Sequence, residues 1–134
     1  MAVETRVPIK HEADIVTARQ QGRALASQLG FSSIDQTFIA TAISEVTRNI
    51  LVHAGGGEII LRTVQGGSGK SGIVIVAHDE GPGIPDVTLA MQNGYSTVNS
   101  LGLGLPGARR MMDEFEIVSE LGKGTTVTMK KWKQ

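Results

Sequence analysis

Hydrophobic residues recur along the chain at two different periods, and each period predicts a different kind of element. Over residues 12–29, and again from Ser33 to the glycines that begin at Gly55, apolar residues recur every three or four positions, as in amphipathic helices. Ser33 lies three residues before Gln36, which predicts a capping box at the start of the second helix. Gly30 follows the first helix, where a left-handed C-terminal cap belongs. The apolar face of the second helix is expected to comprise Ile34, Phe38, Ile39, Ala42, Ile43, Val46, Ile50 and Leu51.

Shorter apolar runs predict strands in the remainder of the chain. These runs cover residues 3–10, 58–64, 72–77, 115–120 and 125–132. The loop QGGSGKSG between the second and third runs lacks the spacing of a phosphate-binding loop and leads into a strand, so a hairpin is expected. Short helices are expected over residues 86–93 and 105–114. This order of elements predicts a two-layer α/β sandwich, with helices on one face of a mixed, mainly antiparallel sheet.

The composition fits one globular domain over residues 1–134, because 40% of the residues are hydrophobic and 19% are charged. Since 13 acidic and 13 basic residues cancel, no global field attracts nucleic acid or anionic membranes. The absence of cysteine excludes disulfides, thiolate chemistry and cysteine-based metal sites. No stretch has the apolar core of a signal peptide or the length of a membrane span, so we expect a cytoplasmic protein. Lys130, Lys131 and Lys133 surround Trp132 and are expected to be a solvated strand end.

Three polar residues on the second predicted helix form a first candidate site. Glu45, Asn49 and His53 follow one another at intervals of four and therefore share one helix face, beside the apolar line. The amide oxygen of Asn49 is a suitable neutral ligand for Mg²⁺, and Glu45 could take a proton from a hydroxyl or a water near that metal. His53 could reach a phosphate. An exposed polar helix face is the alternative interpretation of the same pattern.

The second candidate site is the stretch IVIVAHDEGPGIPD, residues 73–86, where an apolar run stops at an acid. The Asp79 carboxylate could accept a hydrogen bond from an exocyclic amino group such as that of adenine, whereas guanine carries an oxygen there and would be rejected. Gly81 and Gly83 have no side chains, so their backbone could lie against a flat base or a sugar. His78 is expected to be structural or exposed. A β-turn that ends the strand is the alternative, because Asp, Gly and Pro are turn formers.

The third candidate site is LGLGLPGARR, residues 101–110. Gly102, Gly104 and Gly107 precede and enter a predicted helix, so backbone amides and the positive helix end could face phosphates. The GxGxxG spacing does not follow a strand of a β-α-β unit, which disfavours a dinucleotide-binding site. Residues 93–101 could act as a lid over this segment.

In order and spacing, these segments resemble the four sequence boxes of the GHKL ATPase superfamily, whose members share the Bergerat fold. The boxes are ExxxN from Glu45 to Asn49, DxGxG from Asp79 to Gly83, GLGLPG from Gly102 to Gly107 and GKGTT from Gly122 to Thr126. The superfamily includes gyrase, MutL proteins, histidine kinases and anti-sigma-factor serine kinases. Within it, TAISEVTRNI and GYSTVNSLGLGLPGARRMMDEF are similar to segments of the switch kinases of bacterial stressosomes.

The resemblance implies a kinase that uses ATP and Mg²⁺. Asn49 would hold Mg²⁺ between the phosphates, Glu45 would activate the acceptor hydroxyl, and Asp79 would contact the adenine amino group. Loop glycines would shape the adenine pocket, backbone amides of the glycine-rich segment would bind the phosphates, and a threonine would support the adenine end. The residues that would make these further ATP contacts are His53, Gly81, Gly83, Gly102, Leu103, Gly104, Leu105 and Thr126.

The resemblance also implies two protein partners. The kinase would phosphorylate a serine or threonine of a STAS-domain scaffold protein of the stressosome. Once released, it would bind and activate a downstream effector such as a metal-dependent phosphatase; neither nucleic acid nor membrane is expected as a partner. Since residues 95–101 contain no lysine or arginine, transition-state charge has to be balanced by Mg²⁺, backbone amides, His53 or a cation elsewhere. Arg48 and Arg109 are candidates for phosphate or partner contacts.

Two classes of function therefore stay open. The first is a protein serine/threonine kinase that acts on a small partner domain. The second is a nucleotide-gated binding protein, an anti-sigma factor or effector activator with little kinase output. A histidine kinase is disfavoured because no pair of dimerisation helices carries an acceptor histidine, and His11 near a helix start is a poor substitute. The chain length disfavours a gyrase-like or MutL-like ATPase.

Overall fold

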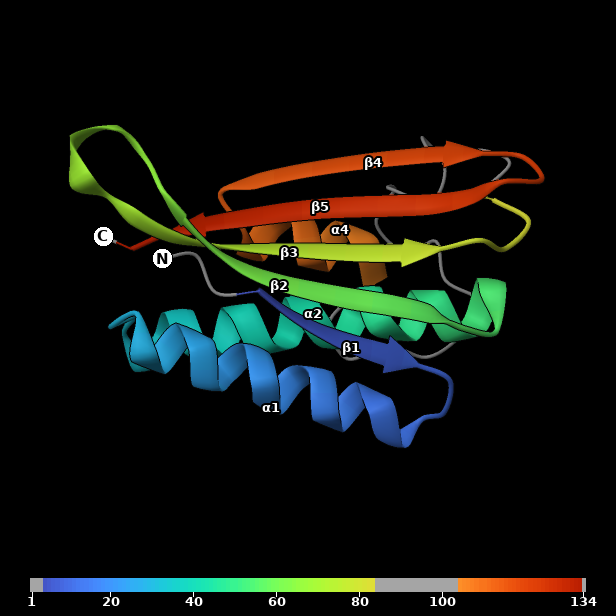
Figure 1. Cartoon of the computed structure of the whole chain (residues 1–134), viewed down its shortest axis with the longest axis horizontal. Helices are drawn as coiled ribbons and strands as arrows, with labels where there is room; N and C mark the ends of the chain where they lie inside the picture. The colour runs from blue at the N-terminus through green and yellow to red at the C-terminus, as the bar shows by residue number, and fades with distance from the viewer. Residues whose placement is uncertain (1–3, 84–103, 134) are drawn as a thin grey trace.

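The computed structural model describes residues 4–83 and 104–133. In chain order, the elements are β1 (Glu4–Ile9), α1 (Ala13–Gln28), α2 (Ser33–Ala54), β2 (Gly57–Gln65), the 3-10 turn η1 (Gly67–Gly69), β3 (Ser71–Asp79), α4 (Gly104–Met111), β4 (Glu114–Glu120) and β5 (Gly124–Trp132). The strands form one sheet in the order β1-β2-β3-β5-β4, and the helices lie against one of its faces (Figure 1). The predicted two-layer α/β sandwich is confirmed, and every pairing between the described strands is antiparallel.

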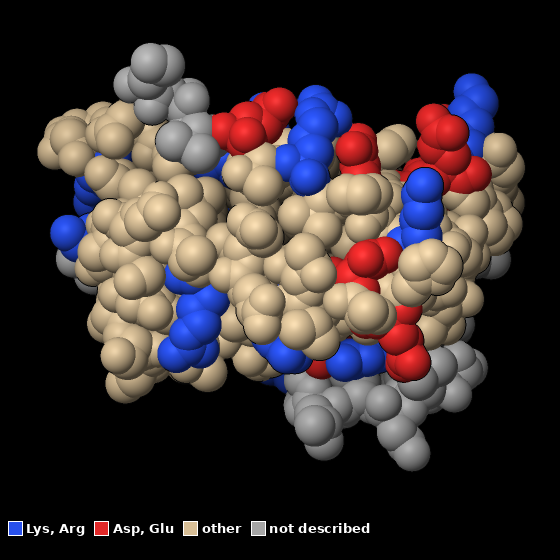
Figure 2. All heavy atoms as spheres, turned by 60° about the horizontal axis from the view of Figure 1, so that its bottom comes forward, with Lys and Arg blue, Asp and Glu red and all other residues tan. Residues whose placement is uncertain are grey.

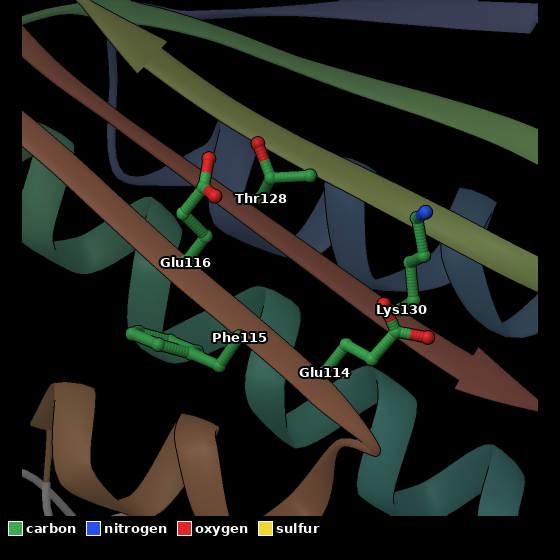
Figure 3. Close-up of a pocket in the computed structure, with 5 residues that line it drawn as sticks. All are labelled: Glu114, Phe115, Glu116, Thr128 and Lys130. Atoms are coloured by element: carbon green, nitrogen blue, oxygen red, sulfur yellow. The ribbon is translucent and has the colours of Figure 1, made fainter.

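Alternate residues of the central strands enter the core, which explains why the apolar runs fold as strands. Ile73 and Ile75 of β3 are completely buried on the helix side, as is Met129 of β5. Residues at the intervening positions, such as Thr128 and Lys130, point to the open face of the sheet (Figure 3). The phase of each strand therefore decides which of its side chains can meet the helices.

The helix α2 begins with a side-chain cap, and both long helices are followed by a left-handed glycine. The Ser32 hydroxyl accepts a hydrogen bond from the Asp35 amide at 3.2 Å, so Ser32 is the N-cap of α2 and the predicted capping box from Ser33 to Gln36 is wrong. Gln36 instead donates to the Phe31 carbonyl at 2.9 Å. Gly30 is left-handed as predicted (φ +87°), and α2 ends at the predicted glycines with Gly55 in the same left-handed conformation (φ +75°).

The start of α1 depends on one carboxylate. Oδ2 of Asp14 accepts hydrogen bonds from the backbone amides of Lys10 at 2.8 Å and His11 at 2.9 Å. These two bonds lower the pKa of Asp14, with the Lys10 amide as the larger cause. The bonds tie the turn after β1 to the first turn of the helix.

The two long helices approach each other closely, and α2 also covers the centre of the sheet. A Cβ at Gly22 of α1 would collide with Cδ1 of Ile43, so a larger residue at this position would force the end of the Ile43 side chain to move. Ile39, Val46 and Ile50 of α2 are buried in the same core. The predicted apolar face of α2 is therefore correct in its central and C-terminal turns. Its first turns differ: Ile34 is 67% exposed and Phe38 is 41% exposed.

The last strand holds the end of α4 in place through Lys131. This side chain is only 11% exposed, and its Nζ donates to the Met111 carbonyl at 2.9 Å. It also lies 3.9 Å from Oδ1 of Asp35 and 5.5 Å from the centre of the Phe38 ring. The prediction of a solvated strand end is thus wrong for Lys131, because odd-numbered residues of β5 face the helices. The helix ends at Met111, whereas the sequence predicted an end at residue 114. The chain leaves the helix earlier because the Asp113 amide donates to the Lys130 carbonyl at 2.9 Å.

Three other predictions concern loops and surface. The hairpin between β2 and β3 is confirmed, and its first turn is closed by a bond from the Gly66 amide to the Lys70 carbonyl at 2.8 Å. The helix predicted over residues 86–93 and the lid predicted over 93–101 lie outside the described residues.

On the face shown in Figure 2, acidic and basic side chains are interspersed. In the described ranges, every helix is too short or too polar to span a bilayer.

We expect Lys131→Met to lower the free energy of unfolding by about 2 kcal/mol, because the variant loses a charged hydrogen bond to the α4 terminus. Urea unfolding followed by circular dichroism measures this change. Lys130→Met is the matched control, since its side chain lies on the open face of the sheet, and it should change stability by less than about 0.5 kcal/mol. Equal effects of the two substitutions would show that Lys131 does not anchor α4.

Candidate functional site

The acid that ends β3 is buried against the helix layer. Asp79 is 4% exposed and is the last residue of the strand, which runs two residues further than the apolar pattern predicted. Its Oδ1 accepts a hydrogen bond from the Gly81 amide at 2.9 Å, as in an Asx turn. A buried carboxylate is costly unless it is hydrogen-bonded, so the turn both fixes and stabilises this group.

Two neighbouring strands can approach Asp79 because they have glycine beside it. A Cβ on Gly57 of β2 would collide with the His78 carbonyl oxygen and would lie 3.1 Å from Cβ of Asp79. A Cβ on Gly124 of β5 would collide with the Asp79 carbonyl oxygen, and Gly124 has a φ of +118°, which disfavours other residues. The backbone on either side of Asp79 therefore has little freedom to move.

The glycines after Asp79 contact other parts of the protein. A Cβ on Gly81 would lie 2.5 Å from Cβ of Ala54, at the end of α2. Gly83 has a φ of +81°, and a Cβ there would lie 2.6 Å from the Glu120 carbonyl oxygen. Contacts within the protein thus explain why glycine occurs at these two positions. The base or sugar contact predicted from the sequence would be an additional reason. The loop is fastened between α2 and the turn that joins β4 to β5.

The polar stripe of α2 is confirmed as a helical feature, but its three residues differ in exposure. Glu45 is 4% exposed, Asn49 is half-buried and His53 is exposed in the last turn. Oε2 of Glu45 lies 3.3 Å from Nη1 of Arg48, three residues further along the helix. An exposed polar face, the alternative interpretation, does not describe Glu45, because this carboxylate is removed from water.

The end of β3 and the end of α2 lie together, at the right-hand side of Figure 1. A Cβ on Gly57 would lie 3.0 Å from Cγ2 of Ile50 and 3.1 Å from Cβ of Asp79, and a Cβ on Gly81 would lie close to both Ala54 and Asp79. Asn49 immediately precedes Ile50 in the helix. The structure therefore brings the second candidate site to the C-terminal half of α2, which carries the first.

Thr126 is not brought together with Asp79. Its Oγ1 lies 2.9 Å from Nδ1 of His78, and this pair occupies the open face of the sheet. Thr125 lies on the helix side instead, where it is 4% exposed, pairs with Asp79 across the strands and has its Oγ1 2.8 Å from Oγ of Ser119. The phase of the apolar residues that follow in β5 is the signal that could have identified Thr125.

The third candidate site is described only from Gly104 onwards. Gly104 begins α4 with a φ of +69°, and α4 packs against α2. The side chain of Leu105 is 5% exposed and belongs to the core, so this side chain is not available to a ligand. Gly102 and Leu103 lie outside the described residues.

Two further features bear on possible ligands. Within residues 4–83 and 104–133, no group of three or more His, Asp or Glu side chains could hold a metal ion on its own. A shallow hollow lies over β4 and β5, lined by Glu114, Phe115, Glu116, Thr128 and Lys130 (Figure 3). Because most of these side chains are on the open face of the sheet, this hollow is separate from the Asp79 site.

Comparison with known proteins agrees with this arrangement. The sequence pattern of the histidine kinase-like ATPase domain matches residues 9–131. Serine/threonine-protein kinase RsbT of Bacillus subtilis is 51% identical over 126 residues, which are 94% of both chains. An anti-sigma F factor of Caldanaerobacter subterraneus is 36% identical over 118 residues, covering 86% of this chain and 82% of that protein.

A solved structure shows the same fold at lower identity. The structure of the RsbU and RsbW domains of a Mycobacterium tuberculosis protein matches all of this chain and 33% of that one, with a TM-score of 0.64 and 20% identity. The family pattern spans nearly the whole sequence, and the sheet, helices and glycine-rich turns agree with it. The chain therefore belongs to the histidine kinase-like ATPase family, the GHKL superfamily with the Bergerat fold, and is an RsbT-like member of it.

Proposed function

We propose that residues 1–134 act as an ATP-dependent serine/threonine-protein kinase domain that works as a switch in stress signalling. Its substrate would be a STAS-domain scaffold protein of a stressosome, and the reaction would take place in the cytoplasm, which supplies ATP. The observation that carries the proposal is the buried Glu45 one helical turn from Asn49, on the helix whose end meets Asp79. The identity of 51% to serine/threonine-protein kinase RsbT supports it.

Asp79 would recognise the base of ATP. A carboxylate can accept more than one hydrogen bond, so Asp79 could retain the Gly81 amide and also accept from the adenine amino group. Because Gly57 and Gly124 restrict the backbone here, the carboxylate could not easily turn to accommodate another base. Thr125, on the same side of the sheet, is better placed than Thr126 to support this end of the nucleotide.

Asn49 would hold Mg²⁺ together with the phosphates. Mg²⁺ takes hard oxygen ligands and keeps several waters, and a half-buried amide oxygen one turn from a buried carboxylate suits this preference. Bound Mg²⁺ would offset the negative charge of the transferring phosphoryl group. Backbone amides at Gly102, Leu103, Gly104 and Leu105 would donate to the phosphates, with His53 near the outer end of the helix.

Glu45 would act as the general base in the transfer. It accepts the proton of the acceptor hydroxyl while that oxygen forms a bond to the γ-phosphorus of ATP. The bond from the γ-phosphorus to the bridging oxygen breaks, and ADP leaves with that oxygen. The proton stays on Glu45 and then passes to solvent. Positioning contributes most to such a reaction, which fits a base held in a buried place.

The switch requires a second partner after the scaffold. Once released, the kinase would bind and activate a downstream effector such as a metal-dependent protein phosphatase. The anti-sigma F relatives, at 36% identity, favour a second candidate function, in which nucleotide binding controls partner capture and kinase output is small. The two candidates differ in whether phosphate reaches the partner.

The first test incubates the purified protein with Mg²⁺, γ-labelled ATP and a STAS-domain protein encoded beside it. We expect label on the partner, and we expect Asn49→Ala to reduce the rate at least about 100-fold, because metal binding and charge neutralisation are both lost. Normal transfer by Asn49→Ala would refute the metal role. Bound ATP without any transfer by the wild-type protein would favour the nucleotide-gated binder.

Asp79→Asn should weaken ATP binding about tenfold to 100-fold and reduce the preference for ATP over GTP, because the amide cannot reproduce two accepting oxygens. Isothermal titration calorimetry with each nucleotide measures both effects. Thr126→Val is the control, since its hydroxyl lies on the open face, and it should bind ATP normally. Unchanged affinities in Asp79→Asn would exclude the adenine contact.

Glu45→Gln should bind ATP with unchanged affinity and transfer phosphate about 100-fold to 10,000-fold more slowly, as expected when a general base is removed. Calorimetry and the labelled-ATP assay together separate binding from transfer. A variant that transfers phosphate at the wild-type rate would exclude Glu45 as the base.

A further inference from the structure

The ion pair between Glu45 and Arg48 joins a buried carboxylate of the candidate site to a guanidinium that is partly exposed to solvent. The Glu45 side chain is 4% exposed, whereas that of Arg48 is 34% exposed, and Nη1 and Oε2 are 3.3 Å apart. Two fully exposed partners at this spacing would contribute little, because water competes for both charges. Here one partner is buried, so its orientation depends on groups that contact it directly.

The position of Arg48 around the helix is informative. At about 100° per residue, Asn49 lies about 40° to one side of Glu45 and Arg48 about 60° to the other side. Asn49 and Arg48 therefore flank the carboxylate. If Asn49 marks the phosphate side of the base, Arg48 lies on the opposite side, where solvent reaches it and where a protein acceptor could approach.

We propose that Arg48 is a positioning residue for phosphate transfer to the partner protein, acting through Glu45. Its guanidinium holds the Glu45 carboxylate toward the incoming serine or threonine hydroxyl and restricts rotation of the side chain. This inference rests on the proposed function, since it assigns Arg48 to the base of that reaction. A misplacement of about 1 Å in such a group can cost about 100-fold in rate.

Phosphoryl transfer depends mainly on the positioning of the reacting groups, so removal of Arg48 should slow it.

The experiment compares Arg48→Met, which keeps the apolar stem, with Arg48→Lys and with Arg23→Met, an exposed arginine on α1. We expect Arg48→Met to lower kcat for the STAS-domain acceptor about 10-fold to 100-fold without changing the Kd for ATP. Arg48→Lys should recover most of the rate, and Arg23→Met should match the wild type. In the Glu45→Gln background, Arg48→Met should have no further effect, because the arginine acts through the carboxylate.

The possible outcomes separate this inference from the proposed function. An equal or higher kcat in Arg48→Met, with active wild-type protein, overturns the role of Arg48 alone. An equally large effect in the Glu45→Gln background also overturns it, because Arg48 would then act independently of the base. Absence of transfer by the wild-type protein overturns both the proposed function and this inference.

Discussion

The site depends on the close packing of three backbone segments around the end of β3. Gly57, Gly81 and Gly124 each lie where a Cβ would overlap a neighbouring atom, and two of those neighbours are carbonyl oxygens next to the Asp79 side chain. Backbone atoms cannot yield as the end of a flexible side chain can, so the three approaches exist only with glycine. Asp79 is thereby held between β2, β5 and the end of α2. The hydrogen bond from the Gly81 amide offsets part of the free-energy cost of burying its carboxylate.

The helix α2 transmits this constraint to the other half of the site. Its core side, including Ile43 and Ile50, is fixed against the sheet, and its ends are fixed by the Ser32 cap and the left-handed Gly55. The polar stripe of Glu45, Asn49 and His53 consequently has a fixed position along the helix axis and a fixed direction relative to Asp79. The far end of α4 is attached to the same frame, because Lys131 reaches both the Met111 carbonyl and Asp35 of α2. The first turn of α4 therefore belongs to a helix whose C-terminal end is anchored.

The sequence predicted the elements and their order because hydrophobic periods of two and about 3.6 are local properties. It also predicted that Glu45, Asn49 and His53 share a helix face, since helix geometry alone requires it. What it missed depends on neighbours far along the chain. A one-residue phase difference in β5 separates Thr125 from Thr126, and Lys131 is buried because Met111 and Asp35 meet it there. The first turns of α2 fit the apolar pattern, but much of Ile34 and Phe38 stays exposed.

The two ends of the candidate site consequently differ in how tightly they are built. Around Asp79, strand register and glycine contacts restrict the backbone, and the Gly81 amide donates to the carboxylate, which suits the proposed recognition of a small, rigid group. Around Glu45, one side chain is buried while its ion-pair partner Arg48 and the nearby His53 are open to solvent. A protein acceptor cannot enter a closed pocket, so the proposed base, Glu45, would have to be buried but reachable from the surface. Its ion pair with the partly exposed Arg48 meets both requirements on a single helix.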